Sequence, residues 1–290
     1  MKILHSLPKN NFAGLEEELT DYKKARVIVF PVPYDSTASV KAGQREGPQA
    51  IINASRYLSL YDEETKTNVS KKGIFTTDFL EPNRGNVEEN NKRIQKVVTQ
   101  LLEDKKFVVT LGGDHSITTG VLNAFKEKFS FTLLHLDAHS DAFEEYEGSA
   151  FSHACVAFNA LKQCDKVVQV GIRSTSEEEL KLNEENVFLM KDLRKNFEEN
   201  LEKIIEKLGD KVYVSLDLDV LDSSVMPAVG TPEPGGLTYE ELLSLLRKVC
   251  EKREVIGFDC VELMPLPGND APNYTAAKIV YKFLSYSFVD

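Results

Sequence analysis

The strongest constraint on the fold is the alternation of short apolar segments with amphipathic segments along the whole chain. The apolar segments are rich in β-branched residues and hydrophobic on both faces, which is typical of parallel strands buried beneath helices. Eight segments have this pattern: Arg26–Val32, Gly73–Thr76, Phe107–Leu111, Phe131–Asp137, Val167–Ile172, Val187–Met190, Val212–Leu218 and Val255–Cys260. The alternation predicts an α/β fold, with a mostly parallel sheet and helices on both of its faces.

Helical patterns lie between these segments. A capping box at Thr238–Glu241 predicts the start of one helix, and Tyr274–Phe288 is expected to form a closing helix. Two further stretches place apolar residues on one helical face: Ile94, Val97, Val98, Leu101 and Leu102 in the first, and Phe197, Leu201, Ile204, Ile205 and Leu208 in the second. The chain has no internal repeat and no linker-like tract, so residues 1–290 are expected to form a single domain.

The charge balance limits the classes of partner. The chain has 290 residues with 46 acidic and 35 basic side chains, a formal net charge of −11. This balance argues against nucleic-acid binding; it suits a cationic ligand or divalent metals, or only a solvated surface. The sequence has neither a secretory leader nor an apolar run of ~18 residues, so we expect a cytoplasmic protein that spans no membrane. Its four cysteines lack metal-site spacing and are expected to be free thiols.

Four of the predicted strands end in residues of metal-binding or catalytic type. In an open α/β sheet, ligands bind at the carboxyl ends of the strands. Side chains two residues apart in an extended segment also project to the same face. We therefore expect the following groups to converge: His115 in GGDHS, Asp137, His139 and Asp141 in DAHSD, Asp217 and Asp219 in SLDLD, and Glu262 after the last strand.

Six of these residues predict a pair of metal ions. Four carboxylates and two imidazoles are too many ligands for one ion, and carboxylates packed so densely need cations to offset their repulsion. An oxygen-rich set without thiolates favours Mn²⁺ over Zn²⁺. Each motif alone has a plainer interpretation, since DxD also occurs in turns and GGDHS could be a tight turn before a helix. His135, between Leu134 and Leu136, is interpreted as a core histidine with its hydrogen bonds satisfied.

The motifs GGDHS, DAHSD and SLDLDVLD, in this order, resemble those of the ureohydrolase superfamily of arginases and agmatinases. The resemblance implies a three-layer α/β/α fold around an eight-stranded, mostly parallel sheet. It also implies a dinuclear manganese centre and a homo-oligomer, either a trimer or a hexamer. The similarity extends over most of the chain, through Gly47–Ile51, Gly171–Ser174, Gly230–Gly236, Gly257–Glu262 and Thr275–Ala277.

The resemblance also assigns roles to residues. One manganese ion would bind His115, Asp137, Asp141 and Asp217, and the other would bind Asp137, His139, Asp217 and Asp219. Water activated by the two ions would attack the guanidinium carbon. The implied catalytic residues are Asp141, Glu262, which would bind the guanidinium group, and His153, which would carry a proton to the leaving amine. His153 could instead be a surface-loop histidine, and Asp114 and Asp259 could orient the ligands.

Two positions depart from the family pattern. Ser223 follows Asp222 where proline is common, which leaves the rigidity of that loop open. Cys155 stands two residues after His153 where glycine is common, which leaves the backbone around His153 open.

The substrate prediction rests on the loop after DAHSD. Phe143 stands where an arginase has a carboxylate-binding asparagine, and Glu144, Glu145 and Glu147 follow it. No lysine or arginine occurs from Phe129 to Leu161, so this loop would repel a substrate carboxylate. We therefore expect a small cationic guanidino substrate that contacts Glu262, His153 and Phe143. Agmatine fits best, with urea and putrescine as products, a step of polyamine biosynthesis.

Other substrates and other classes of protein are also compatible with parts of this sequence. Arginine, guanidinobutyrate or formiminoglutamate would fit if Arg173, Arg45 or a neighbouring subunit supplied positive charge. A deacetylase-like amide hydrolase on the same fold would keep one zinc ion and fewer carboxylates, so metal stoichiometry separates it from a ureohydrolase. A non-enzymatic descendant should have lost a metal ligand, His153 or Glu262, and this sequence retains all of them.

Overall fold

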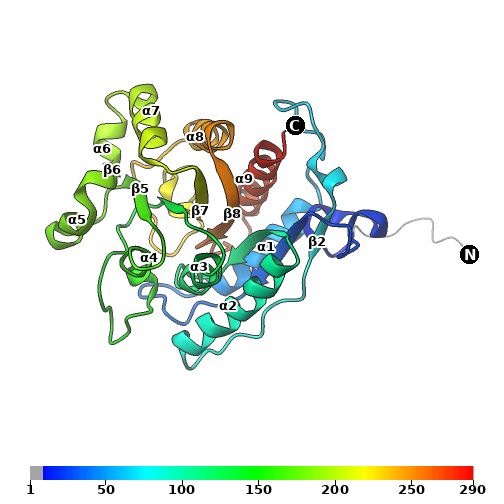
Figure 1. Cartoon of the computed structure of the whole chain (residues 1–290), viewed down its shortest axis with the longest axis horizontal. Coiled ribbons are helices and arrows are strands. Elements are labelled where there is room, and N and C mark those ends of the chain that lie inside the picture. The colour runs from blue at the N-terminus through cyan, green and yellow to red at the C-terminus, as the bar shows by residue number, and fades with distance from the viewer. Residues whose placement is uncertain (1–8, 290) are drawn as a thin grey trace, which may run out of the picture.

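The computed structural model describes residues 9–289, and within them eight strands form one sheet in which every pair is parallel (Figure 1). The strands are β1 (Val27–Val32), β2 (Ile74–Thr76), β3 (Phe107–Gly112), β4 (Thr132–Leu136), β5 (Lys166–Ile172), β6 (Val187–Leu189), β7 (Lys211–Asp217) and β8 (Glu254–Val261). All eight predicted strands are present, with ends that differ from prediction by at most one residue. The predicted α/β fold is confirmed.

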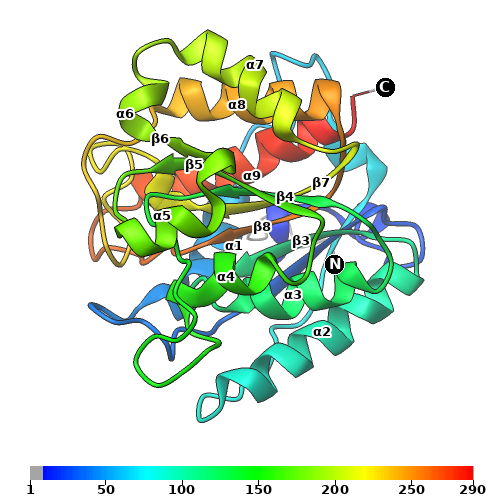
Figure 2. The ribbon, with the colours of Figure 1, turned by 60° about the vertical axis from the view of Figure 1, so that its left-hand side comes forward.

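Helices cover both faces of the sheet (Figure 2). They are α1 (Gly47–Ser55), α2 (Val87–Glu103), α3 (Ile117–Lys126), α4 (Val156–Ala160), α5 (Glu177–Asn183), α6 (Met190–Leu193), α7 (Phe197–Lys207), α8 (Tyr239–Lys252) and α9 (Ala271–Ser287). Side chains of α2, α3 and α4 share one hydrophobic core with Ile28 and Phe30 of β1. Those of α1, α7, α8 and α9 share the other core with Val27 and Val29. Successive side chains of β1 thus point to opposite faces of the sheet, and each face is covered by its own layer of helices. This is the expected three-layer arrangement.

The predicted helix signals are also confirmed. The hydroxyl of Thr238 accepts a hydrogen bond from the backbone of Glu241, whose carboxylate accepts one in return, so a capping box begins α8. The stretch with Ile94 and the stretch with Leu201 form α2 and α7, and each buries the apolar face that its spacing indicated. The closing helix, α9, begins three residues before the predicted Tyr274.

The order of the strands brings the four predicted ligand segments together. That order is β2-β1-β3-β8-β7-β4-β5-β6, so β8 and β7 lie between β3 and β4. The first two strands, β1 and β2, therefore lie on the outer side of β3, whereas β5 and β6, which follow β4, lie on the outer side of β4, so the direction of strand addition reverses. Such a reversal opens a crevice at the carboxyl ends of the central strands. The four central strands, β3, β8, β7 and β4, are those that end in the predicted site residues.

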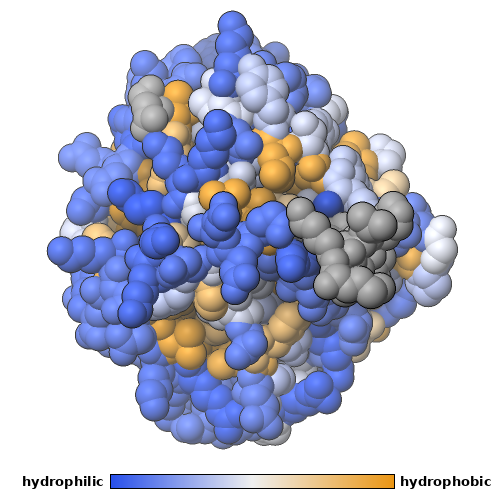
Figure 3. Space-filling model, turned by 90° about the vertical axis from the view of Figure 1, so that its right-hand side faces the viewer, coloured by the Kyte–Doolittle hydropathy of each residue, from blue (hydrophilic) through white to orange (hydrophobic). Residues whose placement is uncertain are grey.

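The remaining sequence expectations concern the surface and the cysteines. The face beside β2 and the C-terminus is mostly hydrophilic, with hydrophobic residues scattered over it (Figure 3). Within residues 9–289, no helix combines the length and the apolar character needed to cross a membrane. Cys155, Cys164, Cys250 and Cys260 are all free thiols, as expected.

Candidate metal centre

The turn after β3 holds His115 at the centre of the site. Gly113 lies against Tyr34, and a Cβ atom at this glycine would lie 1.8 Å from the Tyr34 carbonyl oxygen, so no larger residue fits. The carboxylate of Asp114 turns away from the crevice. It accepts hydrogen bonds from the backbone N–H and the hydroxyl of Thr37, at 2.9 Å each, and from Ser116. Asp114 thus fastens the turn, which agrees with the orienting role that the resemblance implied.

His115 faces three carboxylates that come from two other strands. Its Nδ1 atom lies 3.1 Å from Asp137 Oδ2, 3.2 Å from Asp217 Oδ2 and 3.4 Å from Asp141 Oδ2. The four residues are buried. They are the set that the resemblance assigned to one metal ion. The structure therefore places three carboxylate oxygens within 3.4 Å of one imidazole nitrogen.

The hydrogen bonds behind His115 show which form of its ring faces the carboxylates. Ser215 donates its one hydroxyl hydrogen to Asp259 Oδ1, at 2.7 Å. Since His115 Nε2 lies 2.8 Å from the same hydroxyl oxygen, Nε2 must carry the hydrogen that Ser215 accepts. In the neutral ring, Nδ1 then points a lone pair at the carboxylates and has no hydrogen-bond partner. A lone pair surrounded by anionic oxygens is a fitting environment for a divalent cation.

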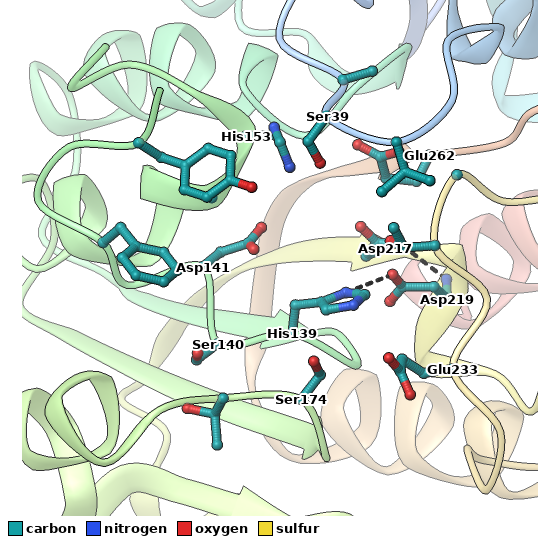
Figure 4. A pocket seen from close by; sticks show the side chains of 18 of the residues that line it. Ser39, His139, Ser140, Asp141, His153, Ser174, Asp217, Asp219, Glu233 and Glu262 are labelled. Atoms are coloured by element: carbon teal, nitrogen blue, oxygen red, sulfur yellow. Dashed lines mark hydrogen bonds and ion pairs between the residues drawn. The ribbon is translucent and has the colours of Figure 1, made fainter. Parts of the chain in front are cut away.

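A second group adjoins the first (Figure 4). His139 Nδ1 lies 2.9 Å from Asp219 Oδ2 and 3.6 Å from Asp137 Oδ1. Asp219 is oriented by the backbone N–H of Ala138, which donates to its Oδ1 at 2.9 Å. Asp217 is oriented in turn by the backbone N–H of Asp219, at 2.8 Å. Asp137 belongs to both groups, through Oδ2 in the first and Oδ1 in the second.

The electrostatics of the two groups favour added positive charge. Burial raises the pKa of Asp217 well above its ordinary value, and the charges of Asp219 and Asp137 raise it further. Burial and the charge of Asp137 likewise raise the pKa of Asp219. Although burial alone would lower the pKa of His139, its contacts with Asp137 and Asp219 raise it to about 12. The charges of Asp137 and Asp219 thus oppose ionisation of neighbouring carboxyl groups, and cations bound among them would relieve that repulsion.

His135 is a core histidine, as predicted, but its hydrogen bonds are not both satisfied. The ring is fully buried in β4, but its Nε2 atom has no hydrogen-bond partner of good geometry and lies 3.0 Å from Asp137 Oδ2. His135 also stacks near His115, with ring centroids 4.9 Å apart. The alternation along the strand could have indicated this position, because residues 135 and 137 project to the same face.

Glu262 lies beside His115 on the adjacent strand end. Its Oε1 atom accepts a hydrogen bond from the backbone N–H of His115 at 2.6 Å, and its own N–H donates to the carbonyl of Gly113 at 2.8 Å. Burial raises the pKa of Glu262 well above its ordinary value, and the charge of Asp114 adds to this effect. Glu262 and Asp141 both adopt left-handed backbone conformations, with φ of 68° and 47°. Such backbones are costly for residues other than glycine and recur at functional sites.

A cavity of about 490 Å³ opens onto these residues. Asp141, Asp217, Asp219 and Glu262 line its inner part together with His139 (Figure 4). Its remaining walls include Lys41, Phe143, Tyr146, His153, Ser174 and Glu233. Lys41 is the only lysine or arginine that lines the cavity within residues 9–289.

The predicted role of the acidic loop is wrong. Glu144, Glu145 and Glu147 are exposed and do not line the cavity, whereas Phe143 and Tyr146 of the same loop do. The centroids of the two aromatic rings lie 5.5 Å apart and the rings form the wall, so the three glutamates point to solvent.

Two other glutamates, Glu179 and Glu233, do line the cavity. The carboxylate of Glu179 is engaged by Ser140, Ala142 and Ser176. No ligand motif in the sequence pointed to Glu233, because it lies in a distant Pro/Gly-rich segment.

His153 also lines the cavity. Its backbone N–H donates to Thr37 Oγ1 at 3.1 Å, and Thr37 in turn donates to Asp114, so the backbone of His153 is tied to the turn that carries His115. Its Nδ1 atom lies 3.2 Å from the Ser152 hydroxyl, and Tyr146 packs edge-on at 5.7 Å between centroids. Cys155 has φ of −112°, which any residue adopts, so glycine is not required there.

Arg173 does not supply positive charge to the cavity. Its guanidinium group donates to the backbone carbonyls of Gly171, Val220, Leu221, Pro234, Asp219 and Glu233. Arg45 is likewise engaged, in an ion pair with Asp35 at 2.6 Å. The carboxylate of Asp222 holds the loop at Gly235 and Gly236, although no proline follows Asp222. Hydrogen bonds from Ser224, Gly235 and Gly236 lower the pKa of its carboxyl to about 2.

Comparison with known proteins agrees with this geometry. The sequence model of the Arginase family matches residues 25–285. An N(1)-aminopropylagmatine ureohydrolase from Thermus thermophilus is 41% identical over 268 residues, 91% of each chain. A protein of the same name from Synechocystis is 36% identical over 280 residues, 93% of this chain and 92% of that one. The crystal structure of the agmatine ureohydrolase of Thermoplasma volcanium superimposes with a TM-score of 0.86 at 32% identity, and the match covers 98% of this chain and 95% of that one. The chain belongs to the arginase family and is a ureohydrolase, an enzyme that hydrolyses a guanidino C–N bond.

Proposed function

We propose that the protein hydrolyses a guanidino compound with a cationic, carboxylate-free tail, in a manganese-dependent reaction that releases urea. Agmatine is the simplest such substrate, and its second product would be putrescine. The observation that carries the proposal is the convergence of four carboxylates and two imidazoles beside Glu262, at the inner end of one cavity. A guanidinium group bound to Glu262 would lie next to the metal-binding residues.

The donor set fits two divalent ions. His115, Asp137, Asp141 and Asp217 would hold one ion, and Asp137, His139, Asp217 and Asp219 would hold the other. These six ligands are four carboxylates and two imidazoles, and such a set without thiolates suits Mn²⁺. Ions bound here would supply Lewis acidity and lower the pKa of a water molecule, which makes water reactive toward a guanidinium carbon at neutral pH.

Glu262 is suited to hold the guanidinium group. Its Oε1 atom is engaged by the His115 backbone, while Oε2 faces the segment at Gly230, where a Cβ atom would lie 3.6 Å away. A planar cation there would pair with the carboxylate through charge-assisted hydrogen bonds. It would also favour the ionised form of Glu262, which burial otherwise disfavours.

His153 is placed to deliver a proton to the leaving amine. Water adds to the guanidinium carbon, the C–N bond to the tail breaks, and the tail nitrogen takes up protons that the water has lost. A histidine at the cavity wall, whose backbone is held by Thr37 and whose ring lies beside the Ser152 hydroxyl, can relay such a proton.

The Glu233 side of the outer cavity favours a positively charged tail. Glu233 lines it, and within residues 9–289 the Glu233 carboxylate forms no ion pair. Arg173 holds the Glu233 backbone carbonyl at 2.9 Å, so the loop that carries this residue is anchored. An ammonium group would be attracted to the carboxylate, and a substrate carboxylate would be repelled.

A second candidate substrate is N(1)-aminopropylagmatine, whose tail carries two amines. Two observations favour it: the 41% identity to a Thermus thermophilus protein of that name, and the Glu233 carboxylate on the wall of the outer cavity, apart from Glu262. Hydrolysis of its guanidino group would release urea and spermidine instead of putrescine.

Urea release from a panel of substrates tests the proposal. The chelator-treated protein, reloaded with Mn²⁺, is assayed with agmatine, N(1)-aminopropylagmatine, arginine and 4-guanidinobutyrate, and the amine product is identified by chromatography. We expect kcat/KM to be highest for one of the two carboxylate-free compounds. Faster urea release from arginine or guanidinobutyrate would overturn the substrate assignment. Absence of urea from every compound would overturn the proposed function.

A further inference from the structure

His135 and Gln169 form a buried polar pair directly behind the metal-binding residues. They are register partners on the adjacent strands β4 and β5. Their exposed fractions are 0% and 1%. Neither residue belongs to the ligand sets described above. Polar groups buried so completely are costly unless each hydrogen bond is satisfied, so their arrangement indicates a specific role.

The orientation of Gln169 follows from its contact with a backbone carbonyl. Its side-chain amide lies 2.7 Å from the carbonyl oxygen of Ser140, which can only accept a hydrogen bond. The amide nitrogen, Nε2, must therefore face Ser140. The same nitrogen lies 3.2 Å from His135 Nδ1, so its second hydrogen is available to that atom. His135 Nδ1 is consequently an acceptor.

This arrangement fixes the tautomer of His135. Since Nδ1 accepts, the hydrogen of the neutral ring is on Nε2. Nε2 lies 3.0 Å from Asp137 Oδ2, and among the described residues neither of these two atoms has a hydrogen-bond partner of good geometry. The other oxygen of Asp137 accepts a hydrogen bond from the backbone N–H of His139, at 2.6 Å. The His135 N–H group therefore lies within reach of the one Asp137 oxygen that no hydrogen bond holds.

We propose that His135 is a positioning residue that donates from Nε2 to Asp137 Oδ2, and that Gln169 sets the tautomer it needs. Asp137 is the carboxylate shared by both groups of metal-binding residues, so its orientation determines whether two ions bind together. This inference rests on the proposed function in one respect, that divalent ions bind at Asp137. The residues that orient metal ligands commonly control metal affinity.

The alternative, His135 as an additional metal ligand, conflicts with the hydrogen bonds. Nε2 would then need a free lone pair, and the hydrogen would be on Nδ1, facing Gln169. The Gln169 amide would have to turn so that its oxygen accepted this hydrogen. That oxygen would then face the Ser140 carbonyl oxygen at about the present 2.7 Å, a repulsive contact between two acceptors.

Manganese binding to three variants tests the proposal. His135→Leu removes the donor, and His135→Gln keeps an N–H donor of similar reach. Gln169→Leu removes the amide group that fixes the tautomer of His135. Calorimetric titration of the metal-free protein should show that His135→Leu weakens Mn²⁺ binding about 10- to 100-fold. His135→Gln should restore most of the loss, and Gln169→Leu should weaken binding less than His135→Leu does. The electron paramagnetic resonance signal of coupled Mn²⁺ pairs should diminish in the same order.

A matched control separates positioning from general destabilisation. Gln163 is another buried glutamine whose amide donates to a backbone carbonyl, that of Thr119, remote from the metal-binding residues. Gln163→Leu should leave Mn²⁺ affinity unchanged, and the metal-free melting temperature shows whether each variant folds. Unchanged affinity in a folded His135→Leu variant would overturn the proposal. If His135 were a ligand, His135→Gln would give no rescue and Gln169→Leu would not weaken binding. Urea release does not enter these measurements, so failure of the proposed function would be seen separately.

Discussion

The Glu262 carboxylate accepts a hydrogen bond from the backbone N–H of His115, 147 positions away in the sequence. This 2.6 Å contact joins the ends of β3 and β8, and it couples the predicted guanidinium-binding residue to the imidazole at the centre of the metal-binding residues. Substrate binding and metal binding thus share one backbone segment.

Glu262→Gln should lower kcat/KM for agmatine about 10- to 100-fold, because a hydrogen bond to a charged group contributes about 1.5–3 kcal/mol. The amide oxygen can still accept from His115, so Mn²⁺ content should be unchanged. Urea-release kinetics and metal analysis of the same preparation check both expectations. Loss of metal would show that Glu262 acts mainly by holding His115.

Asp137→Asn should abolish binding of both ions, because this residue lies in both groups. Metal analysis after dialysis should find about two Mn²⁺ ions per chain in the unmodified protein and none in the variant. Loss of a single ion would mean that Asp137 serves only one site. Full activity after exhaustive chelation would contradict metal dependence altogether.

His153→Asn should lower kcat about 10²- to 10⁴-fold, the usual contribution of a positioned general acid. Its metal content should remain normal, since His153 is tied to Thr37 and Ser152 and not to the carboxylates. Steady-state rates of urea release provide the measurement. A nearly normal rate would assign proton delivery to water.

Glu233→Gln should raise KM for agmatine about 3- to 10-fold, because a carboxylate at the cavity wall attracts the ammonium group. The double change Glu144→Gln with Glu145→Gln is the matched control. It removes more charge but from exposed positions, and it should leave the ratio of agmatine to arginine activity unchanged. If the double change altered the ratio of agmatine to arginine activity more than Glu233→Gln does, the acidic loop and not Glu233 would determine the preference for a cationic tail.

Lys282→Met should destabilise the fold by about 3–5 kcal/mol, the cost of breaking a buried ion pair. The Lys282 ammonium lies 3.0 Å from Asp62 and 2.9 Å from Glu64, and its side chain is 5% exposed. Burial alone would lower the pKa of Lys282, but these carboxylates raise it above its ordinary value. Burial would raise the pKa of Asp62, and bonds from Thr65 and Lys282 lower it.

The stabilisation by the Lys282 ion pairs depends on pH because both partners must be charged. The stabilisation is fully present between the unfolded pKa of a carboxyl group, about 4, and that of lysine, about 10. It is lost as pH falls through the lowered carboxyl pKa or rises through the raised lysine pKa. Urea unfolding of both proteins at several pH values should therefore give a difference that is constant near neutrality and smaller in acid. A difference independent of pH would show that the substitution acts by disrupting packing instead.

Local patterns in the sequence predicted the strands and the ligand types, because both depend on neighbouring residues. Runs such as Phe107–Leu111 are apolar on both faces, and DAHSD follows a strand directly, so the presence of metal ligands at strand ends could be inferred. Their convergence was expected from the general rule for open α/β sheets, but the order of the strands could not be inferred, since the insertion of β8 and β7 between β3 and β4 depends on pairings distant in sequence.

The errors, and the role of Arg173 that the sequence left open, have a common physical origin. The direction of Glu144 and Glu145 depends on the packing of Phe143 against Tyr146, and the role of Arg173 depends on carbonyls of a loop 46 or more residues away. His135 was placed correctly in its strand, but its function depends on Gln169 of the neighbouring strand. Contacts between distant segments leave no periodic signal in a single sequence.

The left-handed backbones of Asp141 and Glu262 place stability and activity in opposition. Each such conformation costs about 1–3 kcal/mol for a residue with a Cβ atom, and glycine would remove that cost. Glycine would also remove a carboxylate that the proposed reaction requires. Selection for a robust fold alone would replace both residues, and selection for turnover retains them. Laboratory evolution toward heat resistance, carried out without an activity screen, should therefore accumulate glycine at positions 141 and 262.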